Sequence, residues 1–147
     1  MTLRVPPGLA PLERALRSEP PERGLVFAAD PDAPADYEAL EEELAECFRL
    51  TQAAVGAGEP VVYVVAQADL LGQRGALAAM RAGALLSAMR SLAVEGARDG
   101  LRANALAVGV DSDGAAVARW ARLLLADAAV SGELVRVEAA HVGKVVP

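Results

Sequence analysis

Four apolar runs of strand length occur along the chain, each followed by a polar or glycine-containing break. The runs at 24–29 and 61–66 are apolar at every position, and the second, Val-Val-Tyr-Val-Val-Ala, is rich in β-branched residues. Such runs are typical of buried parallel strands rather than of strands with one solvated face. Two runs that are interrupted by polar residues, at 100–107 and 133–137, predict two further strands.

Helical periodicity fills the segments between these runs. Apolar residues at spacings of three and four predict a brief helix over 9–17 and longer helices over 36–55, 76–97 and 115–126. Asp36 and the turn 111–114 are suited to cap the helices that follow them. In the second helix, the spacing of Tyr37, Leu40, Leu44, Phe48 and Thr51 predicts the inward face. Strands that alternate with helices predict one α/β domain over 1–147, with a mostly parallel sheet of about four or five strands and helices on both faces.

The predicted helix over 76–97 has an unusual composition. Alanine, glycine and serine occupy most of its positions, and leucine, methionine and valine cover the remaining arc. A helix that is apolar around most of its circumference is buried on more than one side. Since a chain of 147 residues has little interior, we expect a second subunit on the outer face of this helix.

Composition and charge exclude several classes of function. The chain carries 14 Lys and Arg against 20 Asp and Glu, a net charge of −6 that argues against a nucleic-acid partner. One cysteine, Cys47, and one histidine, His141, permit neither an internal disulfide nor a His/Cys metal cage. The N-terminal residues lack a signal-peptide core and no apolar run reaches membrane length, so we expect a cytoplasmic protein with no membrane partner.

Individual polar residues favour structural roles. The acidic series at 38, 41, 42, 43 and 46 is typical of a solvated helix face rather than of a metal site. Tyr63 lies within a strand, where a packed ring with one hydrogen bond is favoured over a proton donor. Cys47 is expected to be a small core or interface side chain, and His141 a surface or interface residue.

Four segments, in order, resemble the short-chain dehydrogenase/reductase family, in particular its bacterial 3-oxoacyl-carrier-protein-reductase-like members. The helix 76–97 ends in Arg-Ser-Leu-Ala-Val-Glu, similar to the family's R-S-L-A-x-E, and residues 100–109 are similar to its G-I-R-V-N-A-V-A-P-G. Residues 48–54 resemble its F-x-L-T-Q-A-A helix, and 124–137 its last helix and strand. The resemblance spans about residues 24–138 and implies a reduced Rossmann-like three-layer sandwich.

The resemblance also implies an Asn, Ser, Tyr, Lys tetrad, which this chain does not carry. The matching positions are Glu43 for Asn, Ala66 or the adjacent Gln67 for Ser, Leu77 for Tyr and Arg81 for Lys. Leucine has no proton to donate, so the family's acid–base chemistry cannot run here. An arginine could imitate the charge of the lysine but would have no tyrosine to activate.

The cofactor-binding elements that the resemblance implies are also missing. A glycine-rich turn that holds pyrophosphate needs closely spaced glycines after the first strand, and this chain has only Gly8 and Gly24 before Leu25. There are too few residues before 25 for the three strands that the family places there, although 3–8 with the helix after it could be a remnant of the first unit. We therefore expect no cofactor, no metal and a truncated, non-catalytic domain.

Two functions remain open. The first is a structural or regulatory subunit that pairs with a copy of itself, as a dimer or tetramer, or with a full-length short-chain reductase. Its predicted interface residues are Leu44, Phe48, Met80, Gly83, Ala84, Ser87, Leu134 and Val145. The second is an enzyme or small-ligand binder with a remodelled pocket at the carboxyl ends of the strands. Its predicted pocket residues are Asp30, Gln67, Arg74, Arg81 and Asp111.

Overall fold

The computed structural model describes residues 1–138 and contains one five-stranded sheet in which all neighbouring strands are parallel. The spatial order of the strands is β1-β2-β3-β4-β5, the same as their order in the sequence. Their bounds are Thr2–Arg4 for β1, Leu25–Ala28 for β2, Val61–Ala66 for β3, Ala103–Val108 for β4 and Leu134–Val137 for β5. The parallel α/β sheet predicted from the apolar runs is thus confirmed. The strand β1 covers the edge of β2.

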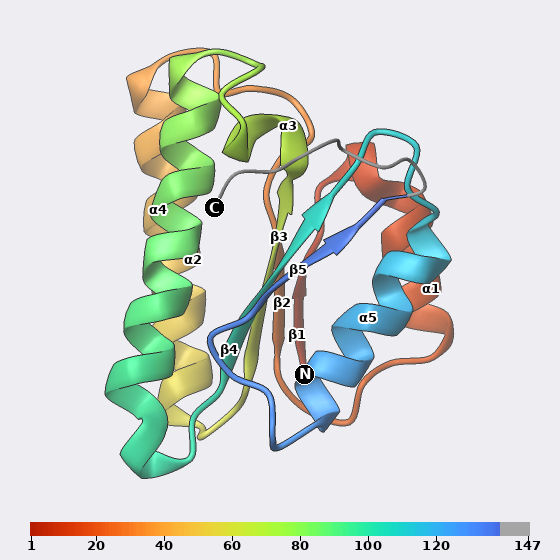
Figure 1. The fold of residues 1–147 in the computed structure, drawn as a ribbon, viewed down its shortest axis with the longest axis vertical. Helices are drawn as coiled ribbons and strands as arrows, with labels where there is room; N and C mark the ends of the chain where they lie inside the picture. The colour runs from red at the N-terminus through yellow and green to blue at the C-terminus, as the bar shows by residue number, and fades with distance from the viewer. Residues whose placement is uncertain (139–147) are drawn as a thin grey trace.

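Helices cover both faces of the sheet and complete three layers (Figure 1). On one face lie α1 (Ala10–Ser18), preceded by the 3-10 turn η1 (Pro7–Leu9), and α5 (Gly114–Ala126). On the other face lie α2 (Tyr37–Gly56) and α4 (Ala76–Glu95), which continues into η2 (Gly96–Asp99). The helix α3 (Gln67–Leu70), a single turn directly after β3, had no signal in the periodicity. The predicted caps are present, because the carboxylates of Asp36 and Asp113 accept from the backbone N–H groups of Ala39 and Ala115.

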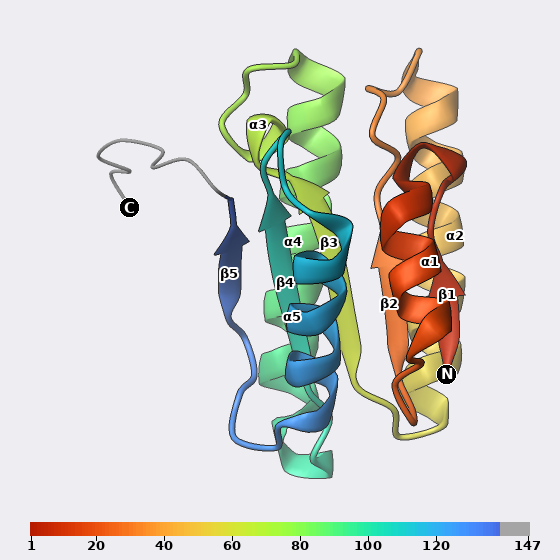
Figure 2. The ribbon, with the colours of Figure 1, turned by 90° about the vertical axis from the view of Figure 1, so that its right-hand side faces the viewer.

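Two of the four crossovers have the uncommon hand. In Figure 2 the strands point upward, α1 and α5 lie in front of the sheet, and the strands run from β1 on the right to β5 on the left. A path from β1 through the front helix α1 to β2 on its left is left-handed, and so is the path through α5. About 98% of parallel crossover connections are right-handed, as those through α2 and α4 are here.

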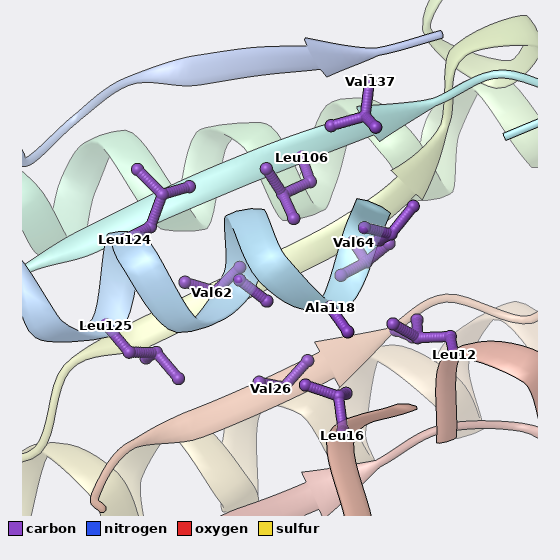
Figure 3. Close-up of a cluster of buried hydrophobic side chains, with 13 residues drawn as sticks. Leu12, Leu16, Val26, Val62, Val64, Leu106, Ala118, Leu124, Leu125 and Val137 are labelled. Atoms are coloured by element: carbon purple, nitrogen blue, oxygen red, sulfur yellow. The ribbon is translucent and has the colours of Figure 1, made fainter. Parts of the chain in front are cut away.

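The packing between α1 and α5 holds this arrangement. Leu12 and Leu16 of α1 join Val117, Leu124 and Leu125 of α5 in one buried cluster against Val26, Val62, Val64 and Leu106 of the sheet (Figure 3). The two helices approach closely at Gly114, where a Cβ atom would lie 2.7 Å from the backbone nitrogen of Leu12. A larger residue at 114 would therefore push α1 away from the cluster.

A second buried cluster fills the space between the sheet and the helices α2 and α4. Tyr63 is fully buried there; its hydroxyl lies 2.8 Å from Oγ1 of Thr51 and its ring meets Phe27 edge-on, which confirms the packed ring. The inward face of α2 differs from the prediction. Its buried residues are Leu40, Glu43, Cys47 and Ala54, whereas Tyr37 and Phe48 are exposed.

The segment Ala76–Asp99 is long and apolar enough to cross a membrane by length and composition, contrary to the expectation that no run reaches this length. In the fold it is a layer of the sandwich. Its inner face packs on the sheet through Ala82, Leu85 and Met89, and it carries the buried guanidinium of Arg81. The core helix of a soluble protein passes the same test of length and composition.

Candidate functional site

Two of the positions matched to the tetrad lie in direct contact. Arg81, on the inner face of α4, is 1% exposed, and its Nη1 donates to Oε2 of Glu43 at 3.0 Å. Its Nη2 donates to Oδ2 of Asp69 at 3.0 Å, and Nη1 also reaches the carbonyl of Asp32 at 2.9 Å. A buried guanidinium is tolerated only when it is paired and hydrogen-bonded in this way.

Further charged groups extend this contact into a network of alternating sign, which we call the Arg81 network: Arg4, Glu43, Glu46, Asp69, Arg74 and Arg81. Arg74 binds Asp69 through two nitrogens, at 2.5 and 2.7 Å. At the other end Arg4 lies 2.9 Å from Glu46 and 3.5 Å from Glu43, with its guanidinium over the ring of Phe27. The six formal charges cancel, so the network ties β1, α2, α3 and α4 together without a net charge.

The ionisation of Asp69 follows from these contacts. Burial alone would raise the pKa of its carboxyl group, but the hydrogen bonds and charges of Arg74 and Arg81 outweigh burial and hold the pKa below its usual value. The same contact raises the pKa of Arg74. Both shifts favour the charged forms of Asp69 and Arg74, as expected for a closely paired carboxylate and guanidinium.

The other two matched positions supply no acid–base group. Leu77 is half-buried in the first turn of α4, and Ala66 is half-buried at the end of β3. Gln67, which follows, is buried and donates through Nε2 to Glu138 at 2.7 Å. The only tyrosine of the sheet, Tyr63, is buried against Thr51, and burial raises its pKa to about 12. None of these groups can donate a proton to a substrate in the way that the family's tyrosine does.

A cavity of about 400 Å³ lies at the carboxyl ends of the strands, on the side of α1 and α5. Most of its wall is aliphatic, from η1 and α1, the ends of β2, β3 and β4, and the first turns of α5. The carboxyl edge of a parallel sheet is the usual place for a ligand in such folds. Of the pocket residues predicted from the sequence, Asp30 and Arg74 line this cavity, whereas Gln67, Arg81 and Asp111 do not.

The turn between β1 and α1 does not fit a pyrophosphate. Pro6, Pro7 and Pro11 have no N–H group, and the N–H groups of Leu9 and Ala10 are taken by the carbonyls of Pro6 and Pro7. A Cβ atom at Gly8 would lie 2.4 Å from Cγ of Pro31, so that proline ring fills the space in front of the glycine. Phosphate binding at a helix N-terminus needs exposed backbone N–H groups and room for the anion. The residues present therefore do not fit a dinucleotide whose pyrophosphate is bound at a helix N-terminus, as in Rossmann folds.

The residues predicted for an interface fall into two groups. Phe48, Met80, Gly83 and Ser87 lie on the exposed side of α2 and α4, with Phe48 61% and Met80 49% exposed. Leu44 and Leu134 are half-buried against the second core cluster, and Ala84 is also half-buried. Val145 and His141 lie outside the described residues.

Sequence reasoning missed Asp69 and Arg4 and misplaced Glu43. The acidic series of α2 is solvated at Glu38, Glu41 and Glu42 but not at Glu43, which is 9% exposed and bound to Arg81. The signal was present, because Glu43 lies three residues after Leu40 and four before Cys47, on the buried stripe of the helix. Among residues 1–138, no group of three or more His, Cys, Asp or Glu side chains is placed to hold a metal ion. Cys47 is buried, as expected, and burial raises the pKa of its thiol to about 11.

Comparison with known proteins identifies the fold. No family model matches the chain, and no curated protein sequence matches it. Among solved structures, it is similar to 4-hydroxyisoleucine dehydrogenase complexed with NADH and succinate, with a TM-score of 0.65, 14% identity, and coverage of 86% of this chain and 71% of that one. The chain thus has a Rossmann-like α/β fold. Since 793 chains of solved structures match, the fold alone does not determine a function.

Proposed function

We propose that this chain is a non-catalytic relative of the short-chain dehydrogenases/reductases that acts as a structural subunit and pairs with a second copy through α2 and α4. The observation that carries the proposal is the Arg81 network. The residues at the matched Asn and Lys positions, Glu43 and Arg81, bind each other and the backbone, so both are committed to holding the fold. Leu77 adds only a hydrocarbon side chain to this region.

The exposed side of α4 supports the assembly role. From Met80 through Gly83 and Ser87 to Val94, which is 78% exposed, this side presents small and apolar groups along the helix. A Cβ atom at Gly83 would meet nothing within 4 Å, so no contact within the chain requires a glycine there. A glycine in a helix interior is unfavourable by about 1 kcal/mol relative to alanine, and close approach of another helix is a physical reason to keep it.

Charge favours a second copy with its helices antiparallel. The two helices run in the same direction (Figure 1). Exposed carboxylates of Glu38, Glu41 and Glu42 lie near the start of α2, whereas around the end of α4 the exposed Arg90 and Arg98 are balanced by the exposed Glu95 and Asp99. A two-fold axis perpendicular to the helices brings the acidic end of one copy to the charge-balanced end of the other and keeps the two acidic ends apart. Closed two-fold contacts are the commonest form of self-association.

Molecular mass measured by light scattering tests the proposal. The wild type is expected to be a dimer, and Gly83→Glu, which has room within the chain, is expected to be a monomer because its carboxylate would be unpaired in the contact. Ala115→Glu is the matched control. It adds the same charge at an exposed position in the first turn of α5, on the opposite face of the sheet, and should leave the dimer intact.

Two outcomes would contradict this reading: a wild type that is monomeric at high concentration, or a Gly83→Glu protein that keeps the wild-type mass. A wild type that is monomeric alone but binds a full-length short-chain reductase would replace the second copy by that partner.

A further inference from the structure

We infer that the cavity at the carboxyl ends of the strands is a binding site for an uncharged, largely apolar small molecule. This inference goes beyond the assembly role and does not depend on it. At about 400 Å³ the cavity is within the range of roughly 300–1,000 Å³ that small-molecule sites occupy. Its walls come from separate segments that the fold brings together: Leu9, Leu12, Val64, Val108 and Val117.

The aliphatic wall determines the body of the ligand. Leu12, Val64 and Val117 belong to the first core cluster, so the cavity opens directly onto the interior of the domain. Burying apolar surface of a ligand against this wall contributes about 25 cal/mol per Å². Water inside such a site finds few hydrogen-bond partners, because the lining residues with polar side chains are Asp30, Arg74 and Ser112.

The charges at the rim exclude an anion. Arg74 is paired with Asp69 through two hydrogen bonds and donates a third to the carbonyl of Pro31, so its charge is already neutralised. Asp30 takes part in no salt bridge among residues 1–138; one of its oxygens accepts from the N–H of Asp32 at 3.0 Å. The rim therefore carries an uncompensated negative charge, which repels phosphates and carboxylates and can accept a hydrogen bond from a neutral ligand.

The turn after β1 excludes phosphates for an independent reason. Its prolines remove backbone donors, and Pro31 occupies the space in front of Gly8. The region that would receive a pyrophosphate is thus filled by hydrocarbon, while the apolar volume beyond it stays open. A ligand with a neutral polar group and an apolar body fits both features.

A matched pair of fluorescent probes tests the inference. N-phenylnaphthylamine is neutral, apolar and carries one N–H donor, and anilinonaphthalene sulfonate is the same skeleton with a negative charge. We expect the neutral probe to bind with one site per chain, and the sulfonated probe and NADH to bind much more weakly. Asp30→Asn keeps an acceptor for the N–H of Asp32 and removes the charge. It should raise the affinity of the sulfonated probe roughly fivefold and leave that of the neutral probe nearly unchanged.

Filling the cavity should abolish the site. Ala66 follows Val62 and Val64 in the alternation of β3, which places it on the cavity side of the sheet, and it lines the cavity. Ala66→Phe should weaken binding of the neutral probe roughly tenfold or more, whereas Ala129→Phe, at an exposed position outside the cavity, should not. Circular dichroism establishes that each variant is folded, and Val108→Phe fills the same space from β4 if Ala66→Phe does not fold.

The exposed side of α4 is the competing site for an apolar probe, and Gly83→Glu separates the two. Loss of the neutral probe with Gly83→Glu, together with unchanged binding to Ala66→Phe, would assign the probe to the helix face and overturn the inference. Equal affinity of the wild type for the neutral and sulfonated probes would overturn the choice of an uncharged ligand. Neither result depends on whether the chain is a dimer.

Discussion

Replacing Arg81 by methionine should be among the most destabilising single changes in this protein. Methionine keeps the length and apolar stem of the side chain but removes the hydrogen bonds to Glu43, Asp69 and the carbonyl of Asp32. Asp69 keeps both of its bonds to Arg74, whereas Glu43 loses its closest cation and keeps only Arg4 at 3.5 Å and the N–H of Asp30 at 2.9 Å. Removing one partner of a buried ion pair costs about 3–5 kcal/mol.

The expected loss can be measured by thermal and urea unfolding. For a domain of this size about 1 kcal/mol corresponds to 2–4 °C, so the midpoint should fall by about 6–20 °C. Arg17→Met is the matched control, because it breaks the surface pair of Arg17 and Glu13 on α1. That variant should lose about 0.5 kcal/mol or less.

A double-mutant cycle identifies the cause of the loss. If the weakly paired, buried carboxylate of Glu43 is responsible, adding Glu43→Gln to Arg81→Met should recover part of the stability, with a coupling of about 1–3 kcal/mol. A loss below about 1 kcal/mol for Arg81→Met alone would refute the reasoning, because the network would then be hydrated and replaceable by water.

Four further outcomes follow from the same structure. Gly83→Ala should raise the free energy of unfolding by about 0.5–1 kcal/mol per chain, because alanine has the higher helix propensity and fits the open space. Urea titrations at concentrations where the chain is monomeric measure this gain. Cys47, with a pKa of about 11, should react with a thiol reagent at pH 8 roughly 100-fold more slowly in the native than in the unfolded protein; equal rates would mean that α2 opens readily. Because the folded pKa of Asp69 is lowered, its contribution to stability is present above its unfolded pKa of about 4 and is lost as the pH falls through the folded value. The urea midpoint should therefore decrease when the pH is lowered below about 4, and this decrease should be smaller in Asp69→Asn. The double variant Leu77→Tyr/Arg81→Lys should not consume NADPH with a 3-oxoacyl thioester, since the turn after β1 still has no space for a pyrophosphate. Measurable turnover by protein free of host reductases would contradict this prediction and the proposal that the chain is non-catalytic.

The strands and long helices could be predicted from the sequence because each carries its own signal. Runs without polar residues indicated β2 and β3, a mostly apolar run indicated β4, and carboxylates at 36 and 113 marked the starts of α2 and α5. The boundaries moved by a few residues: the run that opens at Gly100 becomes a strand only at Ala103, because Gly100 adopts a positive φ of 70° at the end of η2. Local patterns were sufficient wherever an element is determined by its own residues.

The Arg81 network could not be predicted because its members come from distant parts of the chain. Arg4, Glu43, Asp69 and Arg81 meet only after β1, α2, α3 and α4 are in place. An isolated pattern of charges on α2 is typical of a solvated face, and the tertiary contact with Arg81 overrides that pattern at Glu43 alone. The same reason explains why Gln67 and Asp111 were wrongly predicted to line the pocket. Their positions near strand ends did not determine which side of the sheet their side chains face.

The left-handed crossover through α1 accounts for both the filled space in front of Gly8 and the presence of the cavity. The handedness rule would place α1 on the face of α2 and α4, but that face is already filled by these helices and by Arg4, whose guanidinium covers Phe27. On the other face, Leu12 and Leu16 find the apolar surface of α5 and close approach at Gly114. The chain then returns directly to β2 beside β1, which brings Pro31 against Gly8 at the carboxyl edge of the sheet. The contact between Pro31 and Gly8 thus arises from the same short connection that leaves aliphatic residues of α1 and α5 facing each other across the strand ends. A variant that detaches α1, such as Gly114→Leu, should therefore both open the turn after β1 and destroy the cavity.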